Sequence, residues 1–148
     1  MAYTNAISSY KETRVKTASQ GQLIIMLYEE AVKHLDRGLE LLALNTEGKK
    51  IPGNIEKISK AILKAQEIVT ELTVSLDFGQ GGEIAKNLFS LYTWFNRELL
   101  QANISHDSYR ITAVRNQINE LKSAWAEIAA KNSTENAGNA VPGINIAG

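Results

Sequence analysis

The chain has 148 residues, with 16 Lys and Arg, 16 Asp and Glu, and no cysteine. This length suits one domain with a substantial hydrophobic core, and the zero formal net charge lacks the basic excess typical of nucleic-acid-binding proteins. The absence of cysteine excludes disulfides, thiolate metal sites and cysteine nucleophiles.

The two ends of the chain differ in composition from its middle. Residues 1–18 are mixed polar with isolated apolar side chains, among them Ile7, Tyr10 and Val15, so we expect an N-terminal arm that is flexible or docked. Residues 133–148 are rich in Asn, Gly and Ala and almost uncharged, which predicts a mobile, disordered tail. Residues 19–132 are predicted to form the folded unit.

Two helices are predicted in the first half of the chain, over about residues 20–44 and 55–76. Ser19 and Gln22 match a capping box before the first helix, and Asn54 is the predicted cap of the second. Apolar or small residues recur at spacings of three and four, as on one helix face: Ile24, Leu27, Ala31, Leu35, Gly38 and Leu42 in the first helix, and Ile55, Ile58, Ile62, Ala65, Val69, Leu72 and Leu76 in the second.

Two further helices are predicted over about residues 83–103 and 108–131, with Glu83 in the first turn of one and Asp107 as cap of the other. Their apolar stripes are Ile84, Leu88, Leu91, Phe95, Leu99 and Ala102, and then Ile111, Val114, Ile118, Leu121, Trp125 and Ile128. Because no segment has the alternation of a strand, the predicted fold is all-α, an antiparallel four-helix bundle.

A helical bundle can hold a cofactor, so an enzyme or a cofactor-binding bundle is an alternative to consider. A di-iron bundle uses paired Glu-x-x-His motifs, whereas His34 follows Glu30 by four residues and His106 falls in a predicted loop. The glycine-rich residues 79–82 lack the Lys-Ser/Thr of a P-loop. We therefore expect no catalysis, no cofactor and no metal.

Charge and hydropathy argue against nucleic acid and membrane as partners. Lys49, Lys50, Lys57, Lys60 and Lys64 form a basic face without interleaved aromatic residues, which is typical of a solvated helix surface. No run approaches the ~18 apolar residues of a membrane-spanning helix, and the first residues do not resemble a secretory signal. We expect a cytosolic protein that does not insert into a membrane.

The helices carry more apolar surface than one core stripe each requires. Residues 23–28 are apolar on all sides of the first helix, and Ile68, Phe89, Tyr92 and Trp94 lie off the predicted stripes. Such residues either widen the core or form an external groove, filled by the N-terminal arm or by a partner helix.

Several motifs follow one another in a fixed order: Tyr10-x4-Val15-Lys16-Thr17-Ala18-Ser19-x3-Leu23-Ile24-x-Met26-Leu27-Tyr28-x2-Ala31, then Lys64-Ala65-x2-Ile68-x2-Glu71-Leu72-x2-Ser75-Leu76-Asp77, then Gly81-Gly82-Glu83-Ile84-Ala85-x-Asn87-Leu88-x2-Leu91-Tyr92, then Ala102-Asn103 and Ala124-Trp125. Together they resemble the flagellin-specific export chaperone family, FliS, over about residues 3–130. Gln20 and Glu29-Glu30 depart from the residues that the family commonly has there, but both changes favour helix.

The resemblance implies a small cytosolic bundle that binds the disordered C-terminal region of flagellin, prevents its premature polymerisation and hands it to the type III flagellar export apparatus. It also implies that residues 1–18 cover part of the binding groove when flagellin is absent. The implied partners are flagellin and a component of the export gate. The sequence leaves open whether the free protein also forms a weak homodimer. A structural bundle that self-associates through the same apolar face is the alternative.

We predict ten partner-binding residues in three groups. The first group contains apolar residues of the arm that we expect to switch between docked and released; in the alternative interpretation the arm is permanently docked. These residues are Ile7, Tyr10 and Val15. The second contains groove residues, which otherwise belong to the core: Met26, Ile68, Leu72, Leu91 and Trp94. The third contains two side-chain amides that we expect to hydrogen-bond the backbone of an extended partner, Asn87 and Asn103. In the alternative interpretation, Asn103 ends a helix and Asn87 hydrogen-bonds a neighbouring helix or faces solvent.

Overall fold

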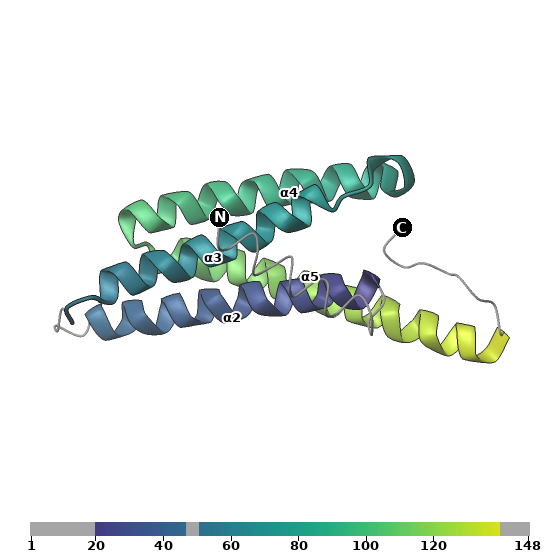
Figure 1. The fold of residues 1–148 in the computed structure, drawn as a ribbon, viewed down its shortest axis with the longest axis horizontal. Coiled ribbons are helices and arrows are strands. Elements are labelled where there is room, and N and C mark those ends of the chain that lie inside the picture. The colour runs from purple at the N-terminus through teal and green to yellow at the C-terminus, as the bar shows by residue number, and fades with distance from the viewer. Residues whose placement is uncertain (1–19, 47–50, 140–148) are drawn as a thin grey trace.

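The computed structural model describes residues 20–46 and 51–139, which form four helices and no strand. The helices are α2 (Gln20–Thr46), α3 (Asn54–Val74), α4 (Phe78–Ser105) and α5 (Ser108–Asn139) (Figure 1). The predicted all-α fold class is therefore confirmed. The predicted arm, with Ile7, Tyr10 and Val15, and the last part of the predicted tail lie outside the described residues.

The helices lie side by side as an antiparallel bundle in which each one contacts two neighbours (Figure 1). α2 packs most extensively, against α3 and α5, whereas α4 and α5 make the least extensive contact. Two ion pairs join neighbouring helices: Arg115 Nε lies 2.9 Å from Asp36 Oδ1 on α2, and Arg110 Nη1 lies 2.9 Å from Glu98 Oε2 on α4. The C-terminal part of α5 extends past the other helices (Figure 1).

The core follows the predicted stripes through the middle of the bundle. Ile58, Ile62 and Val69 of α3 are fully buried, and so are Phe95 and Leu99 of α4. These positions meet the facing helices because residues three and four apart share one side of a helix. Burial of apolar side chains at this spacing is the main contribution to the stability of the bundle.

The core is wider than predicted at its centre and shorter at its ends. Tyr92 and Ile68, which lie off the predicted stripes, are buried, so they widen the core. Conversely, the stripe residues Ile55, Ile84 and Ile128 are exposed. Ile55 and Ile84 lie close to the starts of α3 and α4, and Ile128 lies in the C-terminal part of α5, so fewer neighbouring helices cover them.

The start of α4 differs from the predicted start at residue 83. Asp77 caps the helix, because its Oδ1 accepts hydrogen bonds from the backbone N–H of Gly79 at 3.0 Å and of Gln80 at 3.1 Å. One helical turn follows, and the chain then bends at Gly82, whose φ of 51° and ψ of −126° are not helical. The predicted loop is thus a capped turn joined to the helix by a glycine kink.

Other helix ends also test the sequence prediction. Asn54 is not a cap: Gly53 occupies that position, and the buried Asn54 side chain donates instead to Asn45 Oδ1, 3.3 Å away at the end of α2. Asp107 does cap α5, since its Oδ1 accepts from the backbone N–H of Tyr109 at 2.9 Å. α5 continues to Asn139, beyond the predicted end at residue 131, because extending a formed helix requires no new nucleus.

Gly38 lies buried inside α2, where a β-carbon would meet Ala61 Cβ at 3.7 Å, an ordinary contact distance. We expect Gly38→Ala to stabilise the protein by about 0.5–1 kcal/mol, because alanine loses less backbone entropy than glycine on entering a helix. Urea denaturation followed by circular dichroism measures this change. A loss of stability would mean that α2 and α3 cannot accept one methyl group between them.

Candidate protein-binding surface

Exposed apolar side chains gather along α3 and α4. Leu63 and Leu100 line one shallow groove between these helices. Val74 lies eleven residues from Leu63 and Phe89 eleven residues from Leu100, which is three helical turns, so each pair shares one side of its helix. We call the following six residues, with exposures from 44% to 76%, the α3–α4 apolar surface: Leu63, Val74, Phe78, Phe89, Leu100 and Ile104.

A patch of this kind is a candidate interaction site, since monomeric proteins seldom leave large apolar side chains clustered in water. Within the patch, the rings of Phe78 and Phe89 pack edge to face with centroids 5.9 Å apart. This contact joins the first turn of α4 to the helix that follows the kink at Gly82. The kink therefore adds an aromatic pair to the apolar surface.

Polar groups line the same groove between the apolar ones. Gln66 Nε2 donates to the backbone carbonyl of Asn96 at 3.3 Å, and Asn96 Nδ2 donates to Thr70 Oγ1 at 3.2 Å. Asn96 Oδ1 and Glu67 Oε2 are little accessible to water and have no hydrogen-bond partner. Unpaired buried acceptors of this kind are costly to stability.

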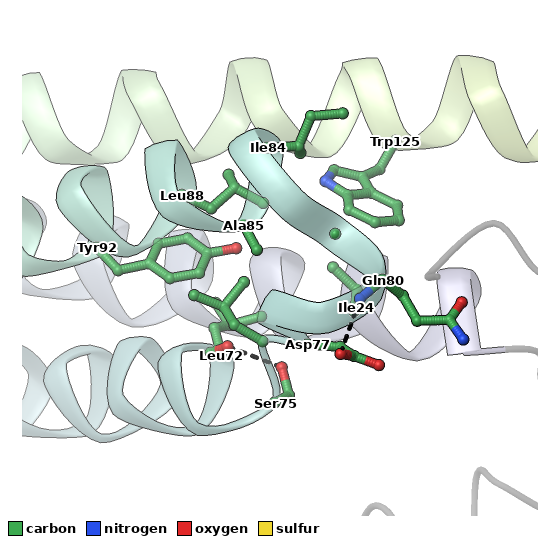
Figure 2. Close-up of a pocket in the computed structure, with 12 residues that line it drawn as sticks. Ile24, Leu72, Ser75, Asp77, Gln80, Ile84, Ala85, Leu88, Tyr92 and Trp125 are labelled. Atoms are coloured by element: carbon green, nitrogen blue, oxygen red, sulfur yellow. Dashed lines mark hydrogen bonds between the residues drawn. The ribbon is translucent and has the colours of Figure 1, made fainter.

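A cavity of about 220 Å³ lies where the N-terminal part of α2, the end of α3 and the start of α4 meet α5 (Figure 2). The Trp125 indole forms one wall, and the Tyr92 hydroxyl points into the cavity from α4 (Figure 2). Most of the other lining residues are apolar: Ile24, Leu72, Leu76, Ile84 and Leu88. Ser75, Asp77 and Gln80 also line the cavity, so it is a mainly apolar pocket with polar groups where α3 leads into α4.

Small residues and the glycine kink keep this pocket open. Gly81 and Ala85 line it, and a β-carbon on Gly81 would lie only 2.8 Å from Ala85 Cβ. No larger side chain therefore fits at position 81 while the turn keeps its path. The bend at Gly82 holds this turn over the pocket, next to Leu76.

A buried hydrogen bond joins two helices beside the pocket. The Tyr28 hydroxyl of α2 lies 2.6 Å from the Tyr92 hydroxyl of α4. Burial raises the pKa of both phenols above the usual value, so both stay protonated and can donate. This hydrogen bond satisfies polar atoms that would otherwise be unpaired in the core.

We expect Tyr92→Phe to lower the free energy of unfolding by about 1–2 kcal/mol, because the Tyr28 hydroxyl then loses its buried partner. Urea denaturation measures the change, and Tyr109→Phe is the matched control because Tyr109 is 85% exposed. Equal stability of the two variants would mean that the hydroxyl pair contributes nothing.

Three of the predicted partner-binding residues come together on α4. Asn87, Leu91 and Trp94 follow one another at spacings of four and three, so they lie along one row of the helix. Asn87 is exposed, whereas Leu91 and Trp94 are half-buried against the core, where the Trp94 ring lies 5.9 Å from that of Phe95. This row keeps an accessible edge and stays a candidate contact.

The other predicted residues lie apart from that row. Ile68 and Leu72 are buried, which favours their alternative interpretation as core, although Leu72 also lines the pocket. Met26 is half-buried on α2. Asn103 Oδ1 accepts a hydrogen bond from Ser59 Oγ at 2.7 Å, so it joins α4 to α3.

The structure also reveals candidates that sequence reasoning missed, chiefly Leu63 and Leu100. Each directly follows a buried core residue, Ile62 or Leu99, but lies off the predicted stripe. Only the packing of α3 against α4 brings the two together. In the described ranges, no three His, Cys, Asp or Glu side chains cluster as metal ligands would. None of the helices in those ranges is long and apolar enough to cross a membrane.

Comparison with known proteins places this bundle in a family. The model of a family described as “Flagellar protein FliS” matches residues 3–132. The chain is 36% identical over 123 residues to the flagellar secretion chaperone FliS of Salmonella typhimurium, covering 82% of this chain and 85% of that protein. It is 35% identical to the Escherichia coli protein of that name (78% and 80% covered) and 28% identical to the Bacillus subtilis one (86% and 88% covered).

These matches extend over nearly the whole chain, including all of α2, α3 and α4. They confirm the resemblance seen in the sequence motifs, and they confirm a chaperone rather than an enzyme. The chain therefore belongs to the FliS family of flagellar secretion chaperones.

Proposed function

We propose that this chaperone binds the disordered C-terminal region of flagellin in the cytosol, blocks its premature polymerisation and hands it to a component of the type III export gate. The observation that carries the proposal is the α3–α4 apolar surface of a chaperone-family bundle. A segment that packs through apolar stripes in a filament exposes those stripes before assembly. A chaperone that covers them needs an exposed apolar surface of its own.

The details of the groove suit a segment that folds as it binds. Leu63 and Leu100 offer apolar contacts to such a segment. The pocket beside Trp125 has room for one bulky apolar side chain of the bound segment. Many such contacts offset the entropy lost when a disordered chain becomes ordered.

Residues 1–18 enter the proposal as a competing cover of this surface. If the arm must leave before flagellin binds, only the uncovered fraction of the chaperone can bind. The apparent affinity for flagellin is then the intrinsic affinity multiplied by that fraction. Ile7, Tyr10 and Val15 are its proposed anchors. Such competition makes release at the export gate possible without an energy source in the chaperone.

Filament assembly tests the proposal directly. Monomeric flagellin is seeded with filament fragments, and growth is followed by light scattering with and without equimolar chaperone. We expect the chaperone to suppress growth and to co-elute with full-length flagellin, but not with flagellin that lacks its C-terminal segment. Unchanged growth at a several-fold excess of chaperone, with separate elution, would refute the proposal.

The same apolar surface also permits a weak homodimer. Sedimentation at increasing concentration, with and without the flagellin segment, distinguishes the two uses. We expect any dimer to dissociate when the segment binds, because both occupy the same surface. A dimer that persists with the segment in excess would favour the self-associating structural bundle.

A further inference from the structure

A second groove, between α2 and α3, is lined mainly by cations. It has a volume of about 160 Å³ and receives Arg37 from α2 together with Lys57, Lys60 and Lys64 from α3. We call these four residues the basic groove. The three lysines follow one another at spacings of three and four, so they form one row along α3. This row lies on a different side of α3 from Leu63, one residue before Lys64.

The positive charge of this groove is poorly neutralised, although the whole chain has zero net charge. Among the described residues, no carboxylate lies within 4.0 Å of the three lysine ammonium groups. Arg37 has one acidic neighbour, Glu40, at 3.6 Å. Glu56, one turn before Lys60, forms no ion pair within the same distance. The groove therefore concentrates positive potential between two helices.

The floor of the groove is apolar, and His34, which also lines the groove, has its Nε2 3.7 Å from Glu30 Oε2. Leu41 and Ala61 are buried beneath the cations. Burial lowers the pKa of the His34 imidazole below its usual value; Glu30 opposes this shift, while Lys64 and Lys33 add to it. The pairing of an apolar floor with a charged rim is typical of peptide-binding grooves.

We propose that the basic groove binds an acidic helical segment of a partner protein, whose carboxylates repeat the three-and-four spacing of the lysine row. Carboxylates at that spacing lie along one side of a helix and face Lys57, Lys60 and Lys64 in register. The methylene stems of the lysines cover the apolar side of such a segment.

The chemistry of the groove favours a peptide over nucleic acid. No Phe, Tyr or Trp side chain lines it, whereas single-stranded nucleic acid is bound largely by stacking on aromatic rings. Three of its four cations are lysines, and the bidentate contacts typical of base recognition come mainly from arginine. The proposed flagellin site is a separate surface, so this inference does not depend on it.

The test uses the full chain and a capped helical peptide of Ala and Gln whose three Glu residues repeat the lysine spacing. Backbone amide NMR shifts report where the peptide binds and how tightly. We expect shifts confined to α2 and α3, weaker at about 300 mM than at about 50 mM salt. Lys57→Gln/Lys60→Gln/Lys64→Gln is expected to weaken binding about tenfold, because each exposed ion pair contributes modestly.

The matched control, Lys86→Gln/Lys122→Gln/Lys131→Gln, removes the same charge from α4 and α5 and should leave peptide binding unchanged. Circular dichroism confirms that both variants are folded. Equal weakening in both variants, or no shifts at all, would overturn the proposal. So would tighter binding of a duplex oligonucleotide or of anionic phosphatidylglycerol vesicles than of the peptide. Flagellin-segment binding is expected to survive in the groove variant.

Discussion

The double substitution Leu63→Asp/Leu100→Asp is expected to weaken binding of the flagellin C-terminal segment at least about 30-fold, or about 2 kcal/mol. The two side chains are 44% and 52% exposed, and this exposed area is what a partner helix removes from water. Aspartate at these positions forfeits the apolar contact and adds a carboxylate that must be desolvated on binding. Isothermal titration calorimetry measures the change.

The matched control for this variant is Leu44→Asp/Ile128→Asp, since both residues are 47% exposed and lie on α2 and α5. It introduces the same charge and should leave segment binding within about twofold of the unsubstituted protein. Thermal unfolding checks that both doubly substituted variants remain folded. If the two variants lose affinity equally, the α3–α4 apolar surface is not the binding site.

Gly82→Val is expected to destabilise the protein by about 2–3 kcal/mol. At φ 51° and ψ −126°, the backbone of residue 82 lies in a region that only glycine adopts without strain. A β-branched residue must either keep this strain or straighten the kink, which moves the turn away from the pocket wall at Trp125. Urea denaturation measures the free energy of unfolding, and tryptophan fluorescence reports a change in the surroundings of Trp125 in the pocket wall.

The control for this substitution is Ser90→Val, which places the same side chain at an exposed, regularly helical position of α4. A change of less than about 0.5 kcal/mol is expected there, because serine and valine have similar helix propensities. If Gly82→Val costs no more than this control, the kink is not a conformation that the sequence requires of glycine.

The helices themselves follow from sequence periodicity. Ile58, Ile62 and Val69 repeat at three and four residues and are fully buried, because that spacing aligns side chains on one side of any helix. Asp107 is recognisable as a cap because a short acceptor side chain immediately precedes a long apolar-periodic run. Both signals are local and need no knowledge of the neighbouring helices.

The details that escaped prediction depend on tertiary contacts. Asn54 has the residue type of a cap, but its side chain is buried against Asn45 at the end of α2. The turn before Gly82 is rich in glycine and therefore resembles a loop, although Asp77 holds it in helical form. Local propensity cannot report either arrangement, because a neighbouring side chain decides each one.

The candidate site was only partly accessible to sequence reasoning for the same reason. A surplus of apolar residues is visible in the sequence, but its division between core and surface depends on how the helices are rotated. Ile68 and Tyr92 face inward and widen the core, whereas Phe89 faces outward. Leu63 and Leu100 become a site only because α3 and α4 lie beside each other.

The α3–α4 apolar surface and the basic groove lie on different sides of α3, which separates their proposed partners. Apolar contact suits a segment that must be covered until export, whereas exposed ion pairs form and dissociate rapidly and weaken with salt. We therefore expect two partners of different chemistry to bind the same bundle together. Amide NMR shifts at both surfaces, with both probe peptides present, are the expected result.

The central claim, that this bundle binds flagellin through apolar surface, is tested most directly by calorimetric titration. A peptide covering the C-terminal helical region of the same organism's flagellin is titrated into the full chain, and into a variant beginning at Thr17, at several temperatures. We predict one-to-one binding with a Kd below about 1 μM, a strongly negative heat-capacity change, and tighter binding without the arm. Absence of heat and of co-elution at high micromolar concentrations would contradict the claim.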